Sequence, residues 1–246
     1  MTLFKRVLLA LLWICLTSQA VSAASLTVGC AANFTGAMKQ LAVMYEKETG
    51  NEILCSFGST GMLYGQITNG APYDLFFAAD EKRPDLLYTS GLAEKPLLYA
   101  TGKAVLWSSD KGLAEALDWK EAVLSSKIEH VAISNPKTAP YGSAAQEALI
   151  KVGLLDKLTP KLVFGKSVGV AFQFAYSGSA EAGFIALSQA LSGKGMEGKY
   201  WAIPEAGKVK QSVAIIKSGK VSESGAFLAW MKTPSVREVI KEYGYE

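Results

Sequence analysis

Apolar and polar positions alternate along the chain in short blocks, which divide it from residue 25 onwards into strand and helix patterns. Apolar runs predict strands at 25–31, 51–57, 75–79, 104–108, 128–133, 162–164, 181–187 and 211–216. Helical spacing of apolar side chains predicts helices between them, among others at 113–124, 143–152 and, closing the chain, 226–243. Strands that alternate with helices in this way predict an α/β fold with mostly parallel sheets.

At four places a predicted strand passes into a helix through a turn rich in glycine, hydroxyl or amide side chains. The clearest is Gly-Ser-Thr-Gly at 58–61, and the others lie at 31–36, 134–142 and 165–169. Such a turn directs free backbone N–H groups and hydroxyls at one spot, where the helix dipole adds roughly half a positive charge. Serine and threonine also cap ordinary helices, and the prolines at 134–142 also suit a rigid loop. The prediction of an anion site therefore depends on the occurrence of such a turn at four places.

The four turns can meet only in a cleft, because ligands of open α/β sheets lie beyond the carboxyl ends of the strands. The simplest geometry is two lobes that each contribute two turns, with the strands near Ala104 and Gln211 as crossovers. We therefore expect residues 25–102 and 209–246 to form one lobe, and residues 103–208 to form the other. A segment at 193–198 contains three glycines and is expected to be flexible.

The first residues have the pattern of a secretory signal peptide. Two basic residues precede an apolar run at 7–16, and small residues at 21–23 stand at the usual cleavage spacing. The apolar run is too short to span a bilayer. We predict that residues 1–24 are a signal peptide cleaved near Ala23 or Ala24, and that the mature protein is soluble and periplasmic.

Charge and cysteine content limit the remaining function classes. Removing the two leader cations lowers the Lys and Arg count from 25 to 23, against 22 Asp and Glu, which leaves a net charge of +1. Without a basic run, nothing indicates a nucleic-acid partner. Cys30 and Cys55 remain in the mature chain, and the sequence leaves open whether they form one disulfide or stay buried thiols.

Catalytic chemistry finds little support in the sequence. The single histidine, His130, lies in a strand pattern, where a packed or surface role is expected. There is no Gly-x-Ser-x-Gly elbow, no spacing typical of metal ligands and no Walker-type loop. An exported hydrolase using Ser59 or Ser167 would need a base that the sequence does not offer.

The predicted turns hold almost no charge, with Lys137 and Lys166 as the exceptions. Aligned amide dipoles can hold an anion without a cation, because they replace its hydration shell. Such a shell donates hydrogen bonds and accepts no proton. It therefore disfavours a protonated oxyanion such as hydrogen phosphate, which would gain from an acceptor.

The motifs in and around these turns are similar to those of a known family. They are Ala-Ala-Asn-Phe-Thr at 31–35, Ser-Phe-Gly-Ser-Thr-Gly at 56–61, Asn-Gly-Ala-Pro at 69–72 with Ala-Asp at 79–80, and Asn-Pro at 135–136 with Ala-Pro-Tyr-Gly at 139–142. The sequence resembles the periplasmic molybdate-binding proteins of ABC transporters over essentially the whole mature chain. The resemblance implies a two-lobed, type II periplasmic-binding-protein fold, each lobe a mostly parallel sheet flanked by helices.

The resemblance also implies what the protein binds and with what it works. Molybdate or tungstate would be clamped between the lobes of a monomer that needs no cofactor, is not an enzyme and serves an inner-membrane ABC permease. The implied ligand-binding residues are Ala32, Asn33, Ser59, Thr60, and, through their backbone N–H groups, Tyr141 and Val168. Many members have serine where this chain has Asn33, and a ligand-reaching tyrosine where it has Ala186. A receptor for sulfate or another tetrahedral oxyanion is the alternative.

Overall fold

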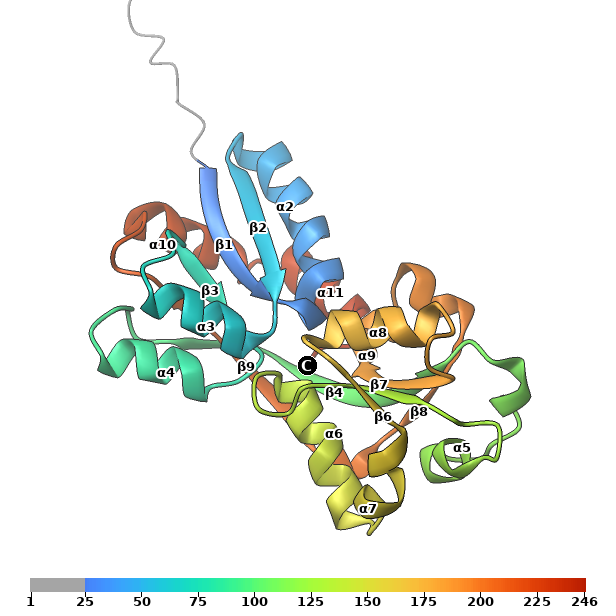
Figure 1. Cartoon of the computed structure of the whole chain (residues 1–246). Coiled ribbons are helices and arrows are strands. Elements are labelled where there is room, and N and C mark those ends of the chain that lie inside the picture. The colour runs from blue at the N-terminus through green and yellow to red at the C-terminus, as the bar shows by residue number, and fades with distance from the viewer. Residues whose placement is uncertain (1–24) are drawn as a thin grey trace, which may run out of the picture.

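The computed structural model describes residues 25–246. The predicted signal peptide at 1–24, with its cleavage near Ala23 or Ala24, lies outside the described residues. In the described part, strands and helices form two lobes joined by two long strands (Figure 1). The predicted α/β, two-lobed architecture is confirmed.

The first lobe is built on three parallel strands. β1 (Ser25–Ala31) lies between β2 (Glu52–Gly58) and β3 (Leu75–Phe77), and pairs in parallel with both. Its helices are α2 (Thr35–Thr49), α3 (Thr60–Thr68), α4 (Lys82–Thr89), α10 (Val221–Trp230) and α11 (Pro234–Glu242). A short 3-10 helix, η2 (Ala32–Phe34), joins β1 to α2. The core of this lobe contains the ring of Phe34, which contacts the rings of Phe77, Tyr99 and Tyr245.

The second lobe repeats this plan. β5 (Val131–Ser134) pairs in parallel with β6 (Leu162–Gly165) and β7 (Ala182–Ala186). Its helices are α5 (Trp119–Leu124), α6 (Pro140–Lys151), α7 (Leu155–Leu158), α8 (Val168–Tyr176) and α9 (Leu187–Ala190). The 3-10 helices are η3 (Lys111–Leu113), η4 (Thr159–Lys161), η5 (Gly193–Glu197) and η6 (Pro204–Ala206).

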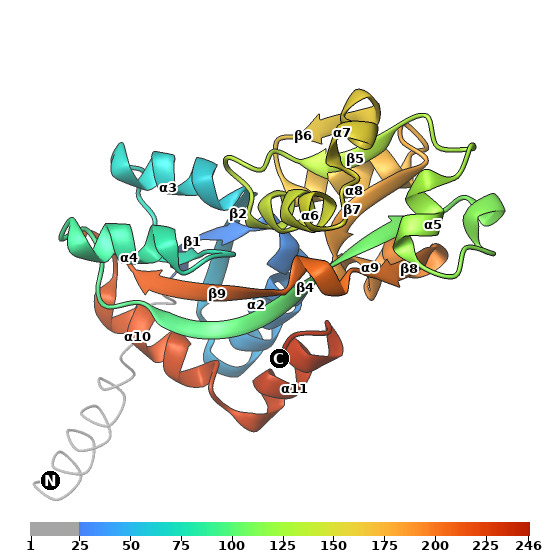
Figure 2. The same cartoon turned by 90° about the horizontal axis from the view of Figure 1, so that it is seen from below.

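Two antiparallel strands, β4 (Leu97–Ser108) and β9 (Lys208–Ile215), run side by side from one lobe to the other (Figure 2). The partner of β4 changes from β9 to β7 between Lys103 and Ala104. Two hydrophobic cores lie on either side of this change. We infer the same lobe division as from the sequence, 25–102 with 209–246 and 103–208, with the partner change one residue after the predicted boundary.

Two predicted elements of the first lobe differ in the structure. The apolar run at 51–57, which suggests a buried strand, forms β2, but β2 is an edge strand of the sheet on which Leu54 is 45% exposed. The helix predicted at 226–243 is two helices, because Pro234 begins α11 and cannot continue the hydrogen bonding of α10.

The second lobe contains further differences from the predicted elements. The helix predicted at 113–124 is instead η3 and the shorter α5, because the Asp118 carboxylate accepts from the N–H groups of Lys120 and Glu121 and begins a new helix there. The segment predicted to be flexible is η5, whose Gly195 carbonyl accepts a hydrogen bond from the Trp107 indole. It is followed by a strand that was not predicted, β8 (Lys199–Ala202), which pairs with β4.

Cys30 and Cys55 are both free thiols. They lie on neighbouring strands, but the register places Cys55 opposite Val28 and Cys30 opposite Phe57. Burial raises the pKa of Cys30, and raises that of Cys55 to about 12, so both thiols stay protonated. Within residues 25–246 no helix is long and apolar enough to cross a membrane.

Candidate anion-binding site

The four strand–helix turns converge on one small cavity where the two lobes meet. The space between its lining atoms, part of which opens to solvent, is about 190 Å³. Its lining consists of Ala31, Ala32, Asn33, Gly58, Ser59, Thr60, Ala79, Ala139, Pro140, Tyr141 and Val168. All six residues predicted from the sequence therefore line one cavity, and they come from four separate segments of the chain.

Backbone N–H groups reach the cavity because helices begin there. Thr60 and Val168 are the first residues of α3 and α8, and Tyr141 is the second residue of α6. The first N–H groups of a helix have no carbonyl partner within that helix. Figure 1 shows α3, α6 and α8 gathered at the junction of the lobes. Their dipoles add positive potential at the place where an anion would lie.

In the second turn, the hydroxyl oxygens of Ser59 and Thr60 each accept a hydrogen bond from a backbone N–H group. Ser59 Oγ accepts from the N–H of Met62 at 3.4 Å, and Thr60 Oγ1 accepts from the N–H of Ala79 at 3.0 Å. Both side chains are buried. Because each oxygen already accepts a hydrogen bond, its O–H is oriented to donate, and Ser59 and Thr60 are suited to donate to an oxyanion.

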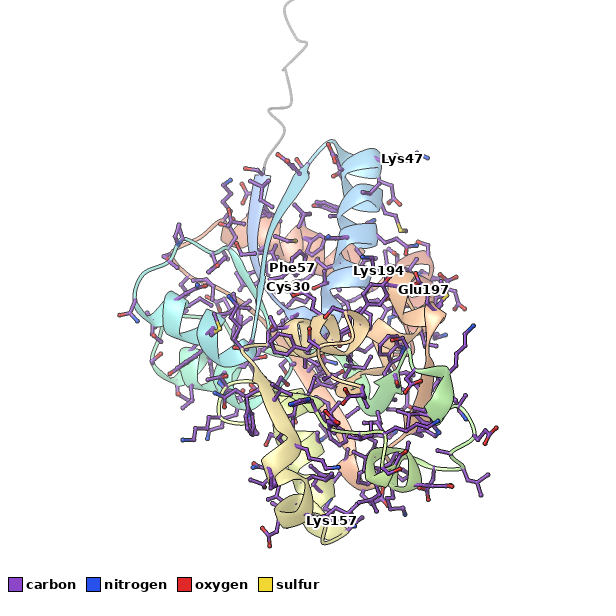
Figure 3. The ribbon with its side chains drawn as sticks, turned by 45° about the vertical axis from the view of Figure 1, so that its right-hand side comes forward. Cys30, Lys47, Phe57, Lys157, Lys194 and Glu197 are labelled. Carbon is purple, nitrogen blue, oxygen red and sulfur yellow. The ribbon has the colours of Figure 1, made fainter. Side chains whose placement is uncertain are left out.

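No charged side chain lines the cavity, and the lysines near it lie outside its wall. Lys137 and Lys166 are both exposed to solvent. Lys166 lines an adjoining groove with Lys39 and Lys194. Figure 3 shows Phe57 and Lys194, two residues of this groove that come from opposite lobes. In residues 25–246 no group of His, Cys, Asp and Glu side chains could hold a metal ion.

The side chain of Asn33 points its donors away from the expected ligand. Both hydrogen bonds of Nδ2 go to other side chains of the protein, to Gln211 Oε1 at 2.7 Å and to Tyr245 Oη at 3.0 Å. Oδ1 is buried and has no hydrogen-bond partner among the described residues. A bare carbonyl oxygen does not favour an oxyanion. In this arrangement the backbone N–H is the group that Asn33 can offer.

The first lobe contacts the loop that precedes α6 in the second lobe. Gly61 N–H donates to Thr138 O at 2.8 Å, and Arg83 Nη2 donates to Lys137 O at 2.9 Å. A Cβ at Gly61 would lie 3.0 Å from the Cα and carbonyl oxygen of Thr138, so glycine permits this close approach. These contacts hold the two lobes together beside the cavity.

The only histidine of the chain lies away from the cavity. His130 is exposed next to β5, and its backbone N–H donates to the Glu181 carboxylate at 2.7 Å. Sequence reasoning missed the polar side chains behind Asn33, since Gln211 and Tyr245 come from distant segments without any motif. The pattern of apolar residues in β9 predicts a strand there, but it does not indicate that Gln211 contacts the site.

A family profile described as "Bacterial extracellular solute-binding protein" matches residues 26–246. The molybdate-binding protein ModA of Azotobacter vinelandii is 42% identical over 236 residues, which are 94% of this chain and 93% of that protein. The chain belongs to the bacterial extracellular solute-binding proteins, in the group of the molybdate-binding proteins.

Further relatives agree with this family. The molybdate-binding protein ModA of Rhodobacter capsulatus is 41% identical over 220 residues, 87% of this chain and 85% of that protein. The solved structure of the periplasmic molybdate-binding protein of A. vinelandii superposes with a TM-score of 0.85 at 40% identity, over 90% of this chain and 98% of that chain. The fold of that solved structure matches the fold of this chain.

Proposed function

We propose that this protein is the exported substrate-binding component of an ABC importer, and that it captures molybdate, and tungstate, between its two lobes. The observation that carries the proposal is the convergence of four strand–helix turns on one small, uncharged cavity rich in hydrogen-bond donors. The membership in the molybdate-binding group supports the choice of ligand.

Each lobe supplies part of the ligand shell. The first lobe offers the Ser59 and Thr60 hydroxyls and the N–H groups of Ala32 and Asn33. The second lobe offers the N–H groups at the starts of α6 and α8, at Tyr141 and Val168. A fully ionised tetrahedral dianion with four acceptor oxygens suits a shell that donates from several directions.

The protein acts as a carrier rather than as an enzyme. It uses no cofactor and works as a monomer in the periplasm, after cleavage of residues 1–24 near Ala23 or Ala24. Its partners are the oxyanion and an inner-membrane permease, and nucleic acid is not among them. The relatives are solute-binding proteins, which supports this role.

Calorimetric titration of the mature protein with molybdate, tungstate, sulfate and phosphate tests the proposal. Donors fixed on two lobes fit one anion radius best, because a smaller anion leaves some of them unpaired. We expect molybdate and tungstate to bind about a hundredfold more tightly than sulfate, which corresponds to roughly two lost hydrogen bonds. Hydrogen phosphate should bind weakest. Sulfate binding as strong as molybdate binding would contradict the proposal.

A further inference from the structure

A buried network of polar side chains lies behind the cavity, where the lobes and both crossover strands meet. Gln211 of β9 is its centre and is fully buried. Its Oε1 accepts from Asn33 Nδ2 at 2.7 Å and from the Tyr99 hydroxyl at 3.0 Å, and its Nε2 donates to Tyr141 Oη at 3.3 Å. The network therefore joins a residue of the cavity wall to β9, β4 and α6.

Gly102 of β4 leaves the space that this network needs. A Cβ at Gly102 would collide with Tyr141 Oη and Gln211 Nε2. The hydroxyls of Tyr99 and Tyr141 stay neutral, because burial raises the pKa of both. The network is thus composed of neutral groups, each of which can donate or accept.

One atom of the network stands out. Asn33 Oδ1 is buried without a partner among residues 25–246, while Asn33 as a whole is only 2% exposed. A buried carbonyl oxygen without a donor is unfavourable, because it has lost its hydrogen bonds to water. The same amide, after a half-turn, would present Nδ2 in place of Oδ1, since the two ends of an amide differ only in their hydrogens.

We propose that oxyanion binding turns the Asn33 amide, and that Gln211 is the positioning residue that turns with it. After both half-turns, Gln211 Nε2 donates to Asn33 Oδ1 and to Tyr99 Oη, and Gln211 Oε1 accepts from the Tyr141 hydroxyl. The Tyr245 hydroxyl, whose single hydrogen now lies within reach of Asn33 O and Ser188 Oγ, donates to Asn33 Oδ1 instead. Asn33 Nδ2 then donates to the anion.

The second arrangement keeps the contacts of Gln211 with donors and acceptors exchanged, so that the Tyr99 hydroxyl accepts where it now donates, and it gives up the contacts of the Tyr245 hydroxyl with Asn33 O and Ser188 Oγ. The Asn33 carbonyl retains the Ser188 hydroxyl, which donates to it at 2.8 Å. The only group that gains a new partner outside the protein is Asn33 Nδ2. The anion therefore selects the second arrangement, because only there does the side chain offer it a donor. This inference rests on the proposed function and assigns the specificity for fully ionised anions partly to Gln211.

Affinity measurements give the first test. Gln211→Leu removes the donor that the turned Asn33 amide needs, and we expect about a tenfold weaker affinity for molybdate. Tyr99→Phe is the matched control, since Tyr99 contacts Gln211 in both arrangements, and the loss should be smaller. Equal losses in the two variants would overturn the positioning role.

Side-chain amide NMR gives a readout that a purely structural role would not move. In full-length mature protein labelled with ¹⁵N, the NH₂ signals of Asn33 and Gln211 are assigned by their disappearance in Asn33→Ala and Gln211→Leu. Saturating molybdate should shift the Gln211 signal in the wild type and leave it in place in Asn33→Ala, which still binds through the remaining donors. A Gln211 signal that stays unmoved in the wild type, or that moves equally in Asn33→Ala, would overturn the inference.

Calorimetry on the same samples separates this inference from the proposed function. If calorimetry shows molybdate binding while the Gln211 NMR signal does not shift, only the proposed turning of the amides is overturned. Absence of any heat in the wild type would overturn the proposed function and this inference with it.

Discussion

Ser59 is placed to serve both the fold and the proposed ligand. Its oxygen caps α3 by accepting from Met62 N–H, and we expect its hydrogen to be donated to the anion. The two tasks use different atoms of one hydroxyl, so they can be separated by substitution. Thr60 combines tasks in the same way, because its oxygen accepts from Ala79 N–H on the neighbouring segment.

Two substitutions at Ser59 separate capping from binding. Ser59→Asp keeps a cap acceptor, so the thermal stability should stay close to that of the wild type, while its negative charge should weaken molybdate binding about a hundredfold or more. Ser59→Ala should lower the free energy of unfolding by about 0.5–2 kcal/mol and weaken binding only about tenfold. Thermal melts and calorimetry measure both. Unimpaired binding by Ser59→Asp would place the anion elsewhere.

The buried tyrosines predict an alkaline limit to stability. Burial raises the pKa of Tyr99, Tyr141 and Tyr245, so the folded state holds protons that the unfolded state releases above about pH 10. The free energy of unfolding should therefore be unaffected by these groups below that pH and fall as the pH rises above it. Chemical denaturation at a series of pH values should show a shallower fall for Tyr99→Phe. An identical slope would contradict the expectation.

At the scale of the element, the site consists of helix beginnings. α3, α6 and α8 start at the cavity, each after a strand that ends beside it, and the N–H groups there are free by geometry rather than by side-chain identity. Substitutions that keep the helix but remove one N–H should therefore act on binding alone.

Val168 allows this to be tested with two variants. Val168→Pro removes the N–H at the first position of α8, a position where proline is well tolerated, and Ser167 before it is already extended. We expect a loss of about 1.5–3 kcal/mol in molybdate binding, roughly ten- to a hundredfold. Val168→Ala keeps the N–H and should change the affinity much less. If Val168→Ala were the more damaging variant in calorimetry, the N–H would not be a ligand donor.

The sequence predicted the elements that carry the site better than those around it. The turns at 31–36, 58–61, 134–142 and 165–169 have local chemistry that specifies a strand followed by a helix, and the structure contains all four. The arrangement of 193–202 depends on distant contacts, such as the Trp107 indole with Gly195, which no local pattern reveals. The direction of the Asn33 amide depends likewise on Gln211 and Tyr245, far away in the chain.

At the scale of the whole molecule, two strands and a few contacts hold the lobes together. β4 and β9 form the connection, and Gly61 and Arg83 of the first lobe donate to the carbonyls of Thr138 and Lys137 in the second. Neither lobe alone surrounds the cavity. An anion therefore has more donors in the closed form and favours it by that difference in affinity.

Small-angle scattering tests this closure. Adding molybdate to the ligand-free protein should lower the radius of gyration, because the second lobe adds its donors only when it approaches the first. The Ser59→Asp variant at the same molybdate concentration provides the control and should show no contraction. An unchanged curve for a wild-type sample that binds molybdate by calorimetry would mean that the lobes are already closed without ligand.

A crystal structure of the molybdate complex, with anomalous diffraction from molybdenum, tests the central claim most directly. We predict one strong anomalous peak within the cavity lined by Ala32, Asn33, Ser59, Thr60, Tyr141 and Val168. The molybdate oxygens should lie about 2.7–3.1 Å from the donor atoms of both lobes. A peak in the neighbouring groove of Lys39, Lys166 and Lys194, or no ordered peak at molybdate concentrations that saturate binding, would contradict the account.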